Sequence, residues 1–223
     1  MRGIRSYVLR QGRTTPAQKR ALEALFPKYG IAFSGNELDP KATFGRTAPL
    51  VLEIGSGMGE STAAIAQAHP EADFIAVEVH GPGVGSLLNR IASENISNLR
   101  VVRHDAVEVL ARMIADGSLA GIHLFFPDPW PKKRHHKRRI VQPEFAELAA
   151  RKLAPGGVFH AASDWPEYAE WIDQVFVANP AFEKTTKALV EKPLTKFEAR
   201  GRRLGHPIRE LCFLRRGSGP GAR

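Results

Sequence analysis

Residues 50–60 read Leu-Val-Leu-Glu-Ile-Gly-Ser-Gly-Met-Gly-Glu. Residues 50–54 form a short, mainly apolar run before a turn, which predicts a strand buried on both faces. The glycines that follow, Gly55, Gly57 and Gly59, let backbone N–H groups approach a ligand closely. Residues 60–68 predict a helix whose N-terminus adds partial positive charge. A strand, a glycine loop and a helix in this order open a nucleotide-binding βαβ unit, with Gly55 and Gly57 as candidate ligand contacts.

Glu53 and the spacing of the glycines narrow the choice of ligand. The loop reads Gly-x-Gly-x-Gly and not the Gly-x-Gly-x-x-Gly of a dinucleotide-binding fold. A carboxylate at Glu53, so close to the loop, would repel a pyrophosphate but attract a cationic ligand such as S-adenosylmethionine. Taken alone, the loop also fits an ordinary tight turn, and a dinucleotide oxidoreductase is a distant alternative.

The whole-chain composition narrows the class of protein. The 223 residues are enough for one large α/β domain with a buried core. A formal net charge of +9 and a pI near 10.0 favour a polyanionic partner. The single Cys212 excludes an internal disulfide and suits a reducing compartment. No apolar run is long enough to span a bilayer, so we expect a cytoplasmic protein with no membrane partner.

Acidic residues recur at the ends of the predicted strands. Residues 73–78 predict a second strand ending in Glu78, about twenty residues past the glycine loop, where an acid accepts hydrogen bonds from ribose hydroxyls. Residues 98–103 predict a third strand followed by Asp105, which suits an adenine amino group or the N-cap of the next helix. Ligands in open α/β sheets gather at the carboxyl ends of the strands. We therefore expect Glu53, Glu78 and Asp105 to converge on one crevice.

The fourth predicted strand, residues 121–126, runs into Pro127-Asp128-Pro129-Trp130. Two prolines fix the backbone on either side of Asp128, so its carboxylate is held in one direction. Trp130 offers an aromatic face on which a base could stack. By itself this turn also fits a rigid connection in which Trp130 covers the edge of the sheet.

A strongly basic run follows directly after this turn. Residues 132–139 read Lys-Lys-Arg-His-His-Lys-Arg-Arg, with six cations and two histidines. Charge runs are usually solvated, but a run joined to a candidate active-site turn would place phosphate contacts beside the chemistry. Metal binding by His135 and His136 is not expected, because no thiol or further histidine is near in the sequence.

The rest of the chain continues the alternation of helices and strands. Thr15, Pro16 and Gln18 predict a helix that begins with a capping box, runs to about Phe26 and is ended by Pro27, before an irregular segment over residues 31–49. Beyond the basic run, further helices are predicted over residues 143–153 and 168–176, and further strands over residues 158–162, 182–190 and 210–215. The expected organisation is a basic N-terminal arm and helix (1–49), a main domain (50–215) and a disordered tail (216–223).

Four of these motifs together resemble the bacterial tRNA (guanine-N7-)-methyltransferase family. They are Leu-Glu-Ile-Gly-Ser-Gly-Met-Gly, Phe-Phe-Pro-Asp-Pro-Trp, Lys-Arg-Arg-Ile-Val-Gln and, at residues 195–198, Thr-Lys-Phe-Glu. The resemblance covers residues 5–215. It implies a Rossmann-like class I methyltransferase fold, α/β, with a seven-stranded, mostly parallel sheet and helices on both faces. It also implies S-adenosyl-L-methionine as methyl donor and tRNA as partner, with the acceptor a guanine N7 in the variable loop.

The resemblance also implies roles for individual residues. Asp128 is the implied catalytic residue, and the family's inclusion of both monomers and homodimers leaves the assembly open. The implied cofactor-binding set is Glu53, Glu78, Asp105 and Asp128, together with Gly55 and Gly57 of the glycine loop. The implied substrate-binding residues are Lys132, Asp164, Thr195, Lys196, Phe197 and Glu198. The implied RNA contacts are Arg134, Lys137, Arg138 and Arg139. Pro131, before Lys132, is a modest departure from the family pattern that would restrict how Lys132 swings.

The chemistry of such a transfer can be worked out from the acceptor. Guanine N7 carries a lone pair and no proton, so no base is needed to activate it. A carboxylate near the guanine gains attraction as positive charge moves from sulfur onto the purine. Asp128 and Asp164 could also accept hydrogen bonds from the N1–H and N2–H₂ edge of guanine. Two other functions stay open, namely a class I methyltransferase acting on rRNA or a protein side chain, and a non-catalytic RNA-binding module with a relict cofactor pocket.

Overall fold

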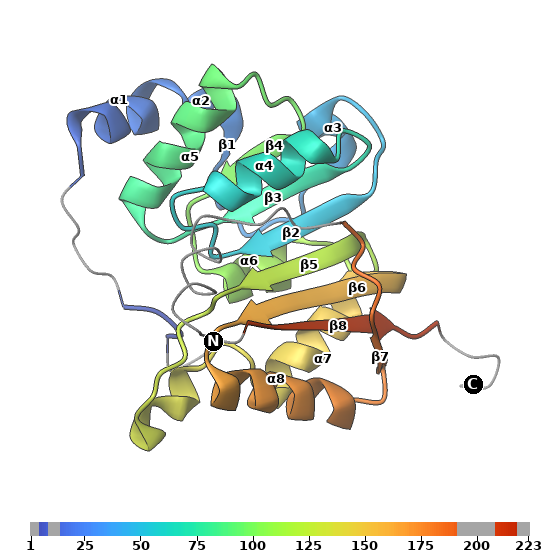
Figure 1. The fold of residues 1–223 in the computed structure, drawn as a ribbon. Coiled ribbons are helices and arrows are strands. Elements are labelled where there is room, and N and C mark those ends of the chain that lie inside the picture. The colour runs from blue at the N-terminus through green and yellow to red at the C-terminus, as the bar shows by residue number, and fades with distance from the viewer. Residues whose placement is uncertain (1–4, 9–13, 191–207, 218–223) are drawn as a thin grey trace.

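The computed structural model describes residues 5–8, 14–190 and 208–217, and these form a sheet with helices on both faces (Figure 1). The helices are α1 (Pro16–Ala24), α2 (Phe26–Tyr29), α3 (Pro40–Phe44), α4 (Glu60–Ala68), α5 (Gly81–Ser93), α6 (Ala106–Met113), the 3₁₀ turn η1 (Lys133–Arg138), α7 (Pro143–Lys152) and α8 (Pro166–Ala178). The strands are β1 (Gly30–Ile31), β2 (Leu50–Ile54), β3 (Asp73–Val77), β4 (Leu99–Val102), β5 (Leu119–Phe125), β6 (Leu153–Ser163), β7 (Phe182–Thr185) and β8 (Arg209–Arg215).

The described strands form one eight-stranded sheet in the order β1-β4-β3-β2-β5-β6-β8-β7. The first six pair in parallel, and β8 pairs antiparallel to both β6 and β7. The predicted Rossmann-like class I methyltransferase fold is therefore confirmed. The prediction of seven strands missed β1, because a two-residue strand has no periodicity to detect.

Helices cover both faces of the sheet and create two hydrophobic clusters. In β2 every residue is buried, and alternate side chains enter different clusters, as Leu52 and Val51 do. The cluster of Leu52 includes residues of α6, α7 and α8, and the cluster of Val51 includes residues of α1, α4 and α5. Because helices cover both faces of the sheet, the faces are not available to a ligand. The parallel strands have their carboxyl ends on one common side of the sheet, and a ligand is expected there.

The N-terminal region differs from its prediction in two places. The capping box at Thr15 is present, but α1 ends at Ala24 and Pro27 lies inside the first turn of α2. A proline fits the first turn of a helix, since no intrahelical bond needs its missing N–H. Residues 31–49, expected to be irregular, contain α3, which Asp39 caps by accepting from two backbone N–H groups.

The C-terminal half also differs in its boundaries. The strand predicted over residues 158–162 is the longer β6, which pairs with β5 from Leu153 onward and shifts register before Val158, around the Pro-Gly-Gly sequence. The strand predicted over residues 182–190 ends at Thr185, where its pairing with β8 stops. None of the helices in the described ranges is both long and apolar enough to cross a membrane.

Candidate active site

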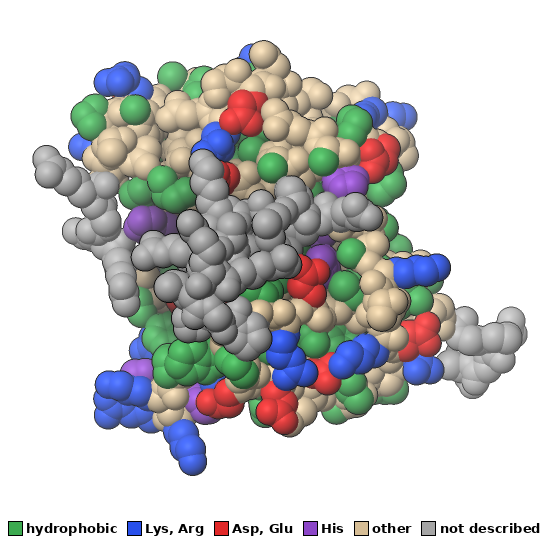
Figure 2. All heavy atoms as spheres, in the orientation of Figure 1, with side chains coloured by type: hydrophobic (Ala, Val, Ile, Leu, Met, Phe, Trp, Pro, Cys, Tyr) green, Lys and Arg blue, Asp and Glu red, His purple; other side chains and the backbone are tan. Residues whose placement is uncertain are grey.

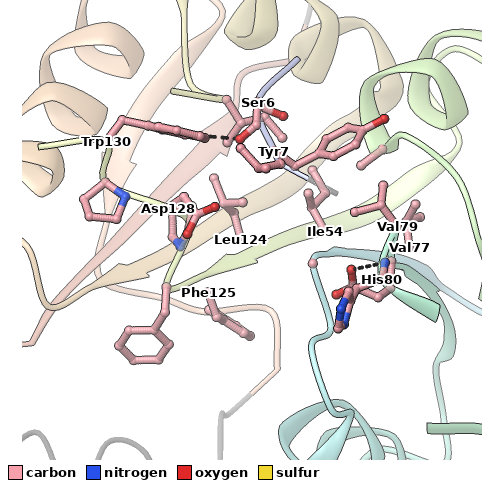
Figure 3. Close-up of a pocket in the computed structure, with 18 of the residues that line it drawn as sticks. Ser6, Tyr7, Ile54, Val77, Val79, His80, Leu124, Phe125, Asp128 and Trp130 are labelled. Atoms are coloured by element: carbon pink, nitrogen blue, oxygen red, sulfur yellow. Dashed lines mark hydrogen bonds between the residues drawn. The ribbon is translucent and has the colours of Figure 1, made fainter. Parts of the chain in front are cut away.

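A cavity of about 600 Å³ opens at the carboxyl edge of the parallel strands. Its walls come from the ends of β2, β3 and β5, from the residues after β4, and from residues 6–8 of the N-terminal segment (Figure 3). The volume is within the range of small-molecule and cofactor sites. Segments far apart in sequence thus meet where the strand order predicts a ligand.

The glycine loop adopts backbone angles that only glycine takes readily. Gly55, Gly57 and Gly59 have φ values of 78°, 55° and 77°. The first turn of α5 packs on this loop so closely that a Cβ on Gly83 would lie 2.3 Å from the carbonyl oxygen of Gly57. The shape of the glycine loop therefore also depends on Gly83, a fourth glycine that the Gly-x-Gly-x-Gly spacing does not indicate.

Glu78 lies at the end of β3 and lines the cavity. Its two carboxylate oxygens accept hydrogen bonds from the backbone N–H groups of Gly57 and His80, each over 2.8 Å. Glu78 thereby holds the glycine loop in place. Each carboxylate oxygen has a further lone pair, so ribose binding by Glu78 stays a prediction that this geometry allows.

Glu53 lies beneath the loop and does not line the cavity. Its side chain is buried, with the residue 3% exposed, and Oε1 accepts from the Thr62 hydroxyl over 2.9 Å. Oε2 has no hydrogen-bond partner among the described residues. Burial raises the pKa of Glu53 to about 7, the Thr62 hydrogen bond opposes this and the charge of Glu78 adds to it. Its role in holding a cation stays a prediction.

Asp105 caps the helix that follows it. Its carboxylate accepts from the backbone N–H groups of Val107 and Glu108 at the start of α6. His104 and Ala106 on either side line the cavity, whereas Asp105 is not part of its wall. The N-cap role is confirmed, and a contact with an adenine amino group stays a prediction.

Asp128 is exposed and lines the cavity on the turn after β5. Figure 3 shows its carboxylate pointing into the hollow between Trp130 and Leu124. The backbone on both sides is unusual, since Phe126 and Trp130 have φ values of 51° and 47°, which large side chains rarely adopt. The two prolines are therefore only part of what directs Asp128.

Two hydrogen bonds hold the Asp128 turn in place. Arg139 Nε donates to the carbonyl oxygen of Pro129 over 2.9 Å. Trp130 Nε1 donates to the carbonyl oxygen of Ser6 over 3.1 Å, across 124 residues of sequence. Neither contact is predictable from the sequence, because neither has a local signal.

The basic run forms the 3₁₀ turn η1, which projects from the corner where Figure 2 shows Lys and Arg side chains gathered. Lys132, Arg134 and Lys137 are exposed there. The guanidinium of Arg138 lies 5.0 Å from the Trp130 ring centroid, so one face of the ring predicted for base stacking is already in contact with a cation.

Arg139 corrects the predicted set of RNA contacts. It is 2% exposed, and its guanidinium contacts Pro129, His136, Glu167 and the Tyr168 ring. A buried side chain with these internal contacts is not available to a phosphate. The basic run therefore combines a solvent-facing set with one structural arginine.

The remaining predicted residues are only partly placed. Asp164 is partly exposed at the end of β6, next to the Asp128 turn in the sheet but outside the cavity wall. Thr195, Lys196, Phe197 and Glu198 lie outside the described residues. Within the described ranges, no three His, Cys, Asp or Glu residues are grouped so that they could hold a metal ion.

Comparison with known proteins places this arrangement in a family. A family model described as "Putative methyltransferase" matches residues 47–211. The tRNA (guanine-N(7)-)-methyltransferase of Aromatoleum aromaticum is 56% identical over 97% of this chain and 85% of that protein. The enzyme of the same name from Nitrosomonas europaea is 54% identical over 95% of this chain and 96% of that protein. The chain belongs to the tRNA (guanine-N(7)-)-methyltransferase family.

The fold of this family member is also found in more distant solved structures. A mutant of the 16S rRNA (adenine(1408)-N(1))-methyltransferase from Catenulisporales acidiphilia, with cosubstrate SAM, matches with a TM-score of 0.56 and 16% identity. That match covers 84% of this chain and 96% of the other. TrmN from Thermus thermophilus matches with a TM-score of 0.55 and 17% identity, over 80% of this chain and 47% of the other. At these identities the likeness concerns the fold alone.

Proposed function

We propose that this protein transfers a methyl group from S-adenosyl-L-methionine to N7 of a guanine in the variable loop of tRNA. The observation that carries the proposal is that Asp128, Glu78 and the glycine loop line one cavity, with exposed cations of η1 beside it. The names of relatives that are more than half identical supply the same reaction and the same class of acceptor. We expect a protein with such an acceptor to act in the cytoplasm.

The residues of the cavity fit S-adenosylmethionine. The glycine loop brings backbone groups to the cavity wall at Gly55, and Glu78 presents a carboxylate beside it. The loop, with positive φ at Gly55 and Gly57, brings the backbone closer to this wall than a residue with a Cβ readily allows. Gly55, Gly57, Glu78 and Asp105 would hold the donor. When bound, S-adenosylmethionine supplies an electrophilic methyl group on a positively charged sulfur.

Asp128 acts on the acceptor. Guanine N7 has no proton to remove, so the contribution of Asp128 is electrostatic and geometric. Its carboxylate stabilises the positive charge that develops on the purine, and this attraction is stronger in the transition state than in the bound base. Asp128 and Asp164 can also accept from the N1–H and N2–H₂ groups of guanine, which adenine does not present as a pair.

We expect the nucleic acid to be bound by exposed cations at η1, with Lys132 directly before the turn and Arg134 and Lys137 within it. Lys132, Arg134 and Lys137 project beside the turn that carries Asp128, so phosphate contacts there would position the acceptor nucleotide. The net charge of +9 adds a long-range attraction to a polyanion. A guanine engaged in the folded core of tRNA must be opened or flipped before its N7 reaches the cavity.

The test is methylation of a purified tRNA that carries guanine in the variable loop, followed by chain cleavage at 7-methylguanosine. We expect one new cleavage site at that guanine, and no cleavage in a matched transcript with adenine at the same position. Labelled methyl groups that appear on rRNA or protein and not on tRNA would overturn the proposed acceptor. Failure of the protein to bind S-adenosylmethionine in an equilibrium titration would overturn the proposed reaction as a whole.

A further inference from the structure

Residues 5–8, here called the N-terminal strap, lie across the mouth of the cavity. Ser6, Tyr7 and Val8 line the same cavity as Gly55, Glu78 and Asp128. Figure 3 shows the Tyr7 ring extending over the hollow from the side opposite Phe125 and His80. The wall that a bound ligand would meet is therefore completed by residues far from the methyltransferase motifs.

Tyr7 and Val8 have surroundings that suit residues covering a ligand. Burial and the negative charges of Asp105 and Glu108 raise the pKa of Tyr7, so its phenol stays neutral and its ring lies near the residue predicted to contact adenine. Val8 lines the cavity yet is 51% exposed. An apolar side chain at the open side of a cavity loses this exposure when a ligand fills the space.

One described hydrogen bond joins the strap to the Asp128 turn. The Trp130 indole N–H donates to the Ser6 carbonyl oxygen over 3.1 Å, as Figure 3 shows. Trp130 reaches this position with a positive φ of 47°, a backbone conformation that bulky residues rarely adopt. From this backbone conformation the indole edge faces the strap.

The basic turn η1 fixes the orientation of the same indole. The Arg138 guanidinium lies 5.0 Å from the Trp130 ring centroid, and the His135 ring meets it edge-on at 5.9 Å. The ring therefore has defined contacts on the side of η1, while its N–H is directed at Ser6. Trp130 contacts the strap and the basic turn at the same time.

We propose that Trp130 is a positioning residue that holds the N-terminal strap over the cavity, so that Tyr7 covers S-adenosylmethionine and slows its release. This inference rests on the proposed function of the cavity. Trp130 acts through the strap and does not need to touch the donor. One neutral hydrogen bond is worth about a fivefold change in a dissociation constant, and this is the size of effect expected.

The test uses full-length variants and an equilibrium and stopped-flow titration with S-adenosylmethionine. Trp130→Phe keeps an aromatic ring and removes the N–H. We expect about fivefold weaker binding through faster dissociation. Trp171→Phe is the matched control, because the Trp171 indole also donates to a backbone carbonyl, that of Val141 over 2.8 Å. Trp171 lines a different cavity, between α7 and α8. The affinity of Trp171→Phe for S-adenosylmethionine should equal that of the unchanged protein.

A double-mutant cycle with Tyr7→Ala separates the strap from a local effect at Trp130. If Trp130 acts through the strap, Trp130→Phe adds little once the Tyr7 ring is absent. Equal effects of Trp130→Phe with and without Tyr7 overturn the inference, and so does an unchanged affinity in Trp130→Phe alone.

Hydrogen exchange on the unchanged protein gives a measurement that needs no variant. Addition of S-adenosylhomocysteine should slow amide exchange in the peptide that contains residues 5–8. Absence of this protection overturns the inference. If the protein binds S-adenosylmethionine and methylates tRNA but the two substitutions have additive effects, the proposed function stands and only the inference about the strap is overturned. If the protein binds no S-adenosylmethionine, both the proposed function and the inference about the strap are overturned.

Discussion

Arg139 is tied to Pro129 by a hydrogen bond of 2.9 Å from its Nε to the proline carbonyl oxygen. The same guanidinium also donates to Glu167 at the start of α8, over 3.1 Å. The last cation of the basic run thus connects the Asp128 turn to a helix of the main domain. Arg139 is 2% exposed, so it belongs to the framework of the active site and not to its RNA-binding surface.

Arg139→Lys should therefore lower stability and turnover without changing the salt dependence of RNA binding. Lysine keeps the charge but cannot make the forked contacts with Pro129 and Glu167. We expect a loss of about 2 kcal/mol in the free energy of unfolding, measured with urea. A normal stability together with a smaller salt dependence of RNA binding would show instead that Arg139 contacts RNA.

Neutralising two exposed cations of η1 should change the salt dependence of RNA binding and leave stability unchanged, the reverse of the result expected for Arg139→Lys. Arg134→Gln combined with Lys137→Gln removes two solvent-facing charges beside the active site. If both contact phosphate, the slope of log affinity against log salt should decrease by about 1.5, with stability unchanged. Fluorescence titration of tRNA at several salt concentrations measures this slope.

The matched control for that pair is Arg112→Gln with Arg151→Gln. Both arginines are exposed and lie in the last turns of α6 and α7, at the edge of the sheet opposite the cavity. The control pair changes the net charge by the same amount. If the slope of log affinity against log salt decreases equally for the two pairs, η1 contributes to RNA binding only through the net charge of the protein.

Asp128→Asn should leave the binding of S-adenosylmethionine close to normal and lower the single-turnover rate on tRNA by about a hundredfold or more. Asparagine keeps the size of the side chain but removes the negative charge that faces the developing positive charge on guanine. Asp116→Asn, at an exposed aspartate paired with Lys152, serves as the control and should keep the normal rate. A near-normal single-turnover rate for Asp128→Asn would exclude Asp128 from the chemistry.

Gly83→Ala should abolish most cofactor binding, whereas Gly81→Ala should be tolerated. A Cβ on Gly83 would lie 2.3 Å from the backbone oxygen of Gly57, so the glycine loop has to move. A Cβ on Gly81 would meet the end of the Arg103 side chain at 3.0 Å, and that side chain can shift. Both glycines lie in the first turn of α5. Equal affinities of the two variants for S-adenosylmethionine would show that the loop does not need this close contact.

Glu53→Gln should stabilise the protein without ligand at alkaline pH. Burial raises the pKa of Glu53 from 4.5 to about 7, so the folded state holds a proton that the unfolded chain releases above pH 4.5. The stability from this proton is fully present below 4.5 and is lost as the pH rises through 7. Glutamine cannot ionise and still accepts from Thr62.

The expected gain for Glu53→Gln is about 3 kcal/mol near pH 8, falling below about 1 kcal/mol near pH 5. Urea unfolding across this range measures it. Glu23→Gln, at an exposed position of α1, should show no such trend. A constant difference between Glu53→Gln and the unchanged protein at all pH values would contradict the raised pKa.

Much of the fold could be predicted from local patterns. The buried run of β2, the glycines with positive φ and the alternation of helices and strands are all local signals, and they place Glu78 and Asp128 at one edge. Asp105 was also predictable as an N-cap, because capping depends on neighbouring residues. Local rules could not detect β1, which exists only through its pairing with β4.

The parts of the site that could not be predicted depend on long-range contacts. Charge alone groups Arg139 with Arg134, and only the positions of Pro129 and Glu167 show that Arg139 is buried. Likewise, the indole of Trp130 reaches Ser6 across 124 residues, and no spacing rule describes such a pair. Glu53 was expected to attract a cation, but its burial raises its pKa and makes it a weaker acid.

The C-terminal strand of the described residues, β8, lies between β6 and β7 in the sheet. Before residues 209–215 leave the ribosome, β6 has an open edge and β7 lacks the strand that it pairs with in the described structure. Open edges recruit strands of other chains. A nascent polypeptide of this protein is therefore exposed to aggregation until β8 emerges. A premature stop before residue 209 would release a product that chaperones or proteases have to remove.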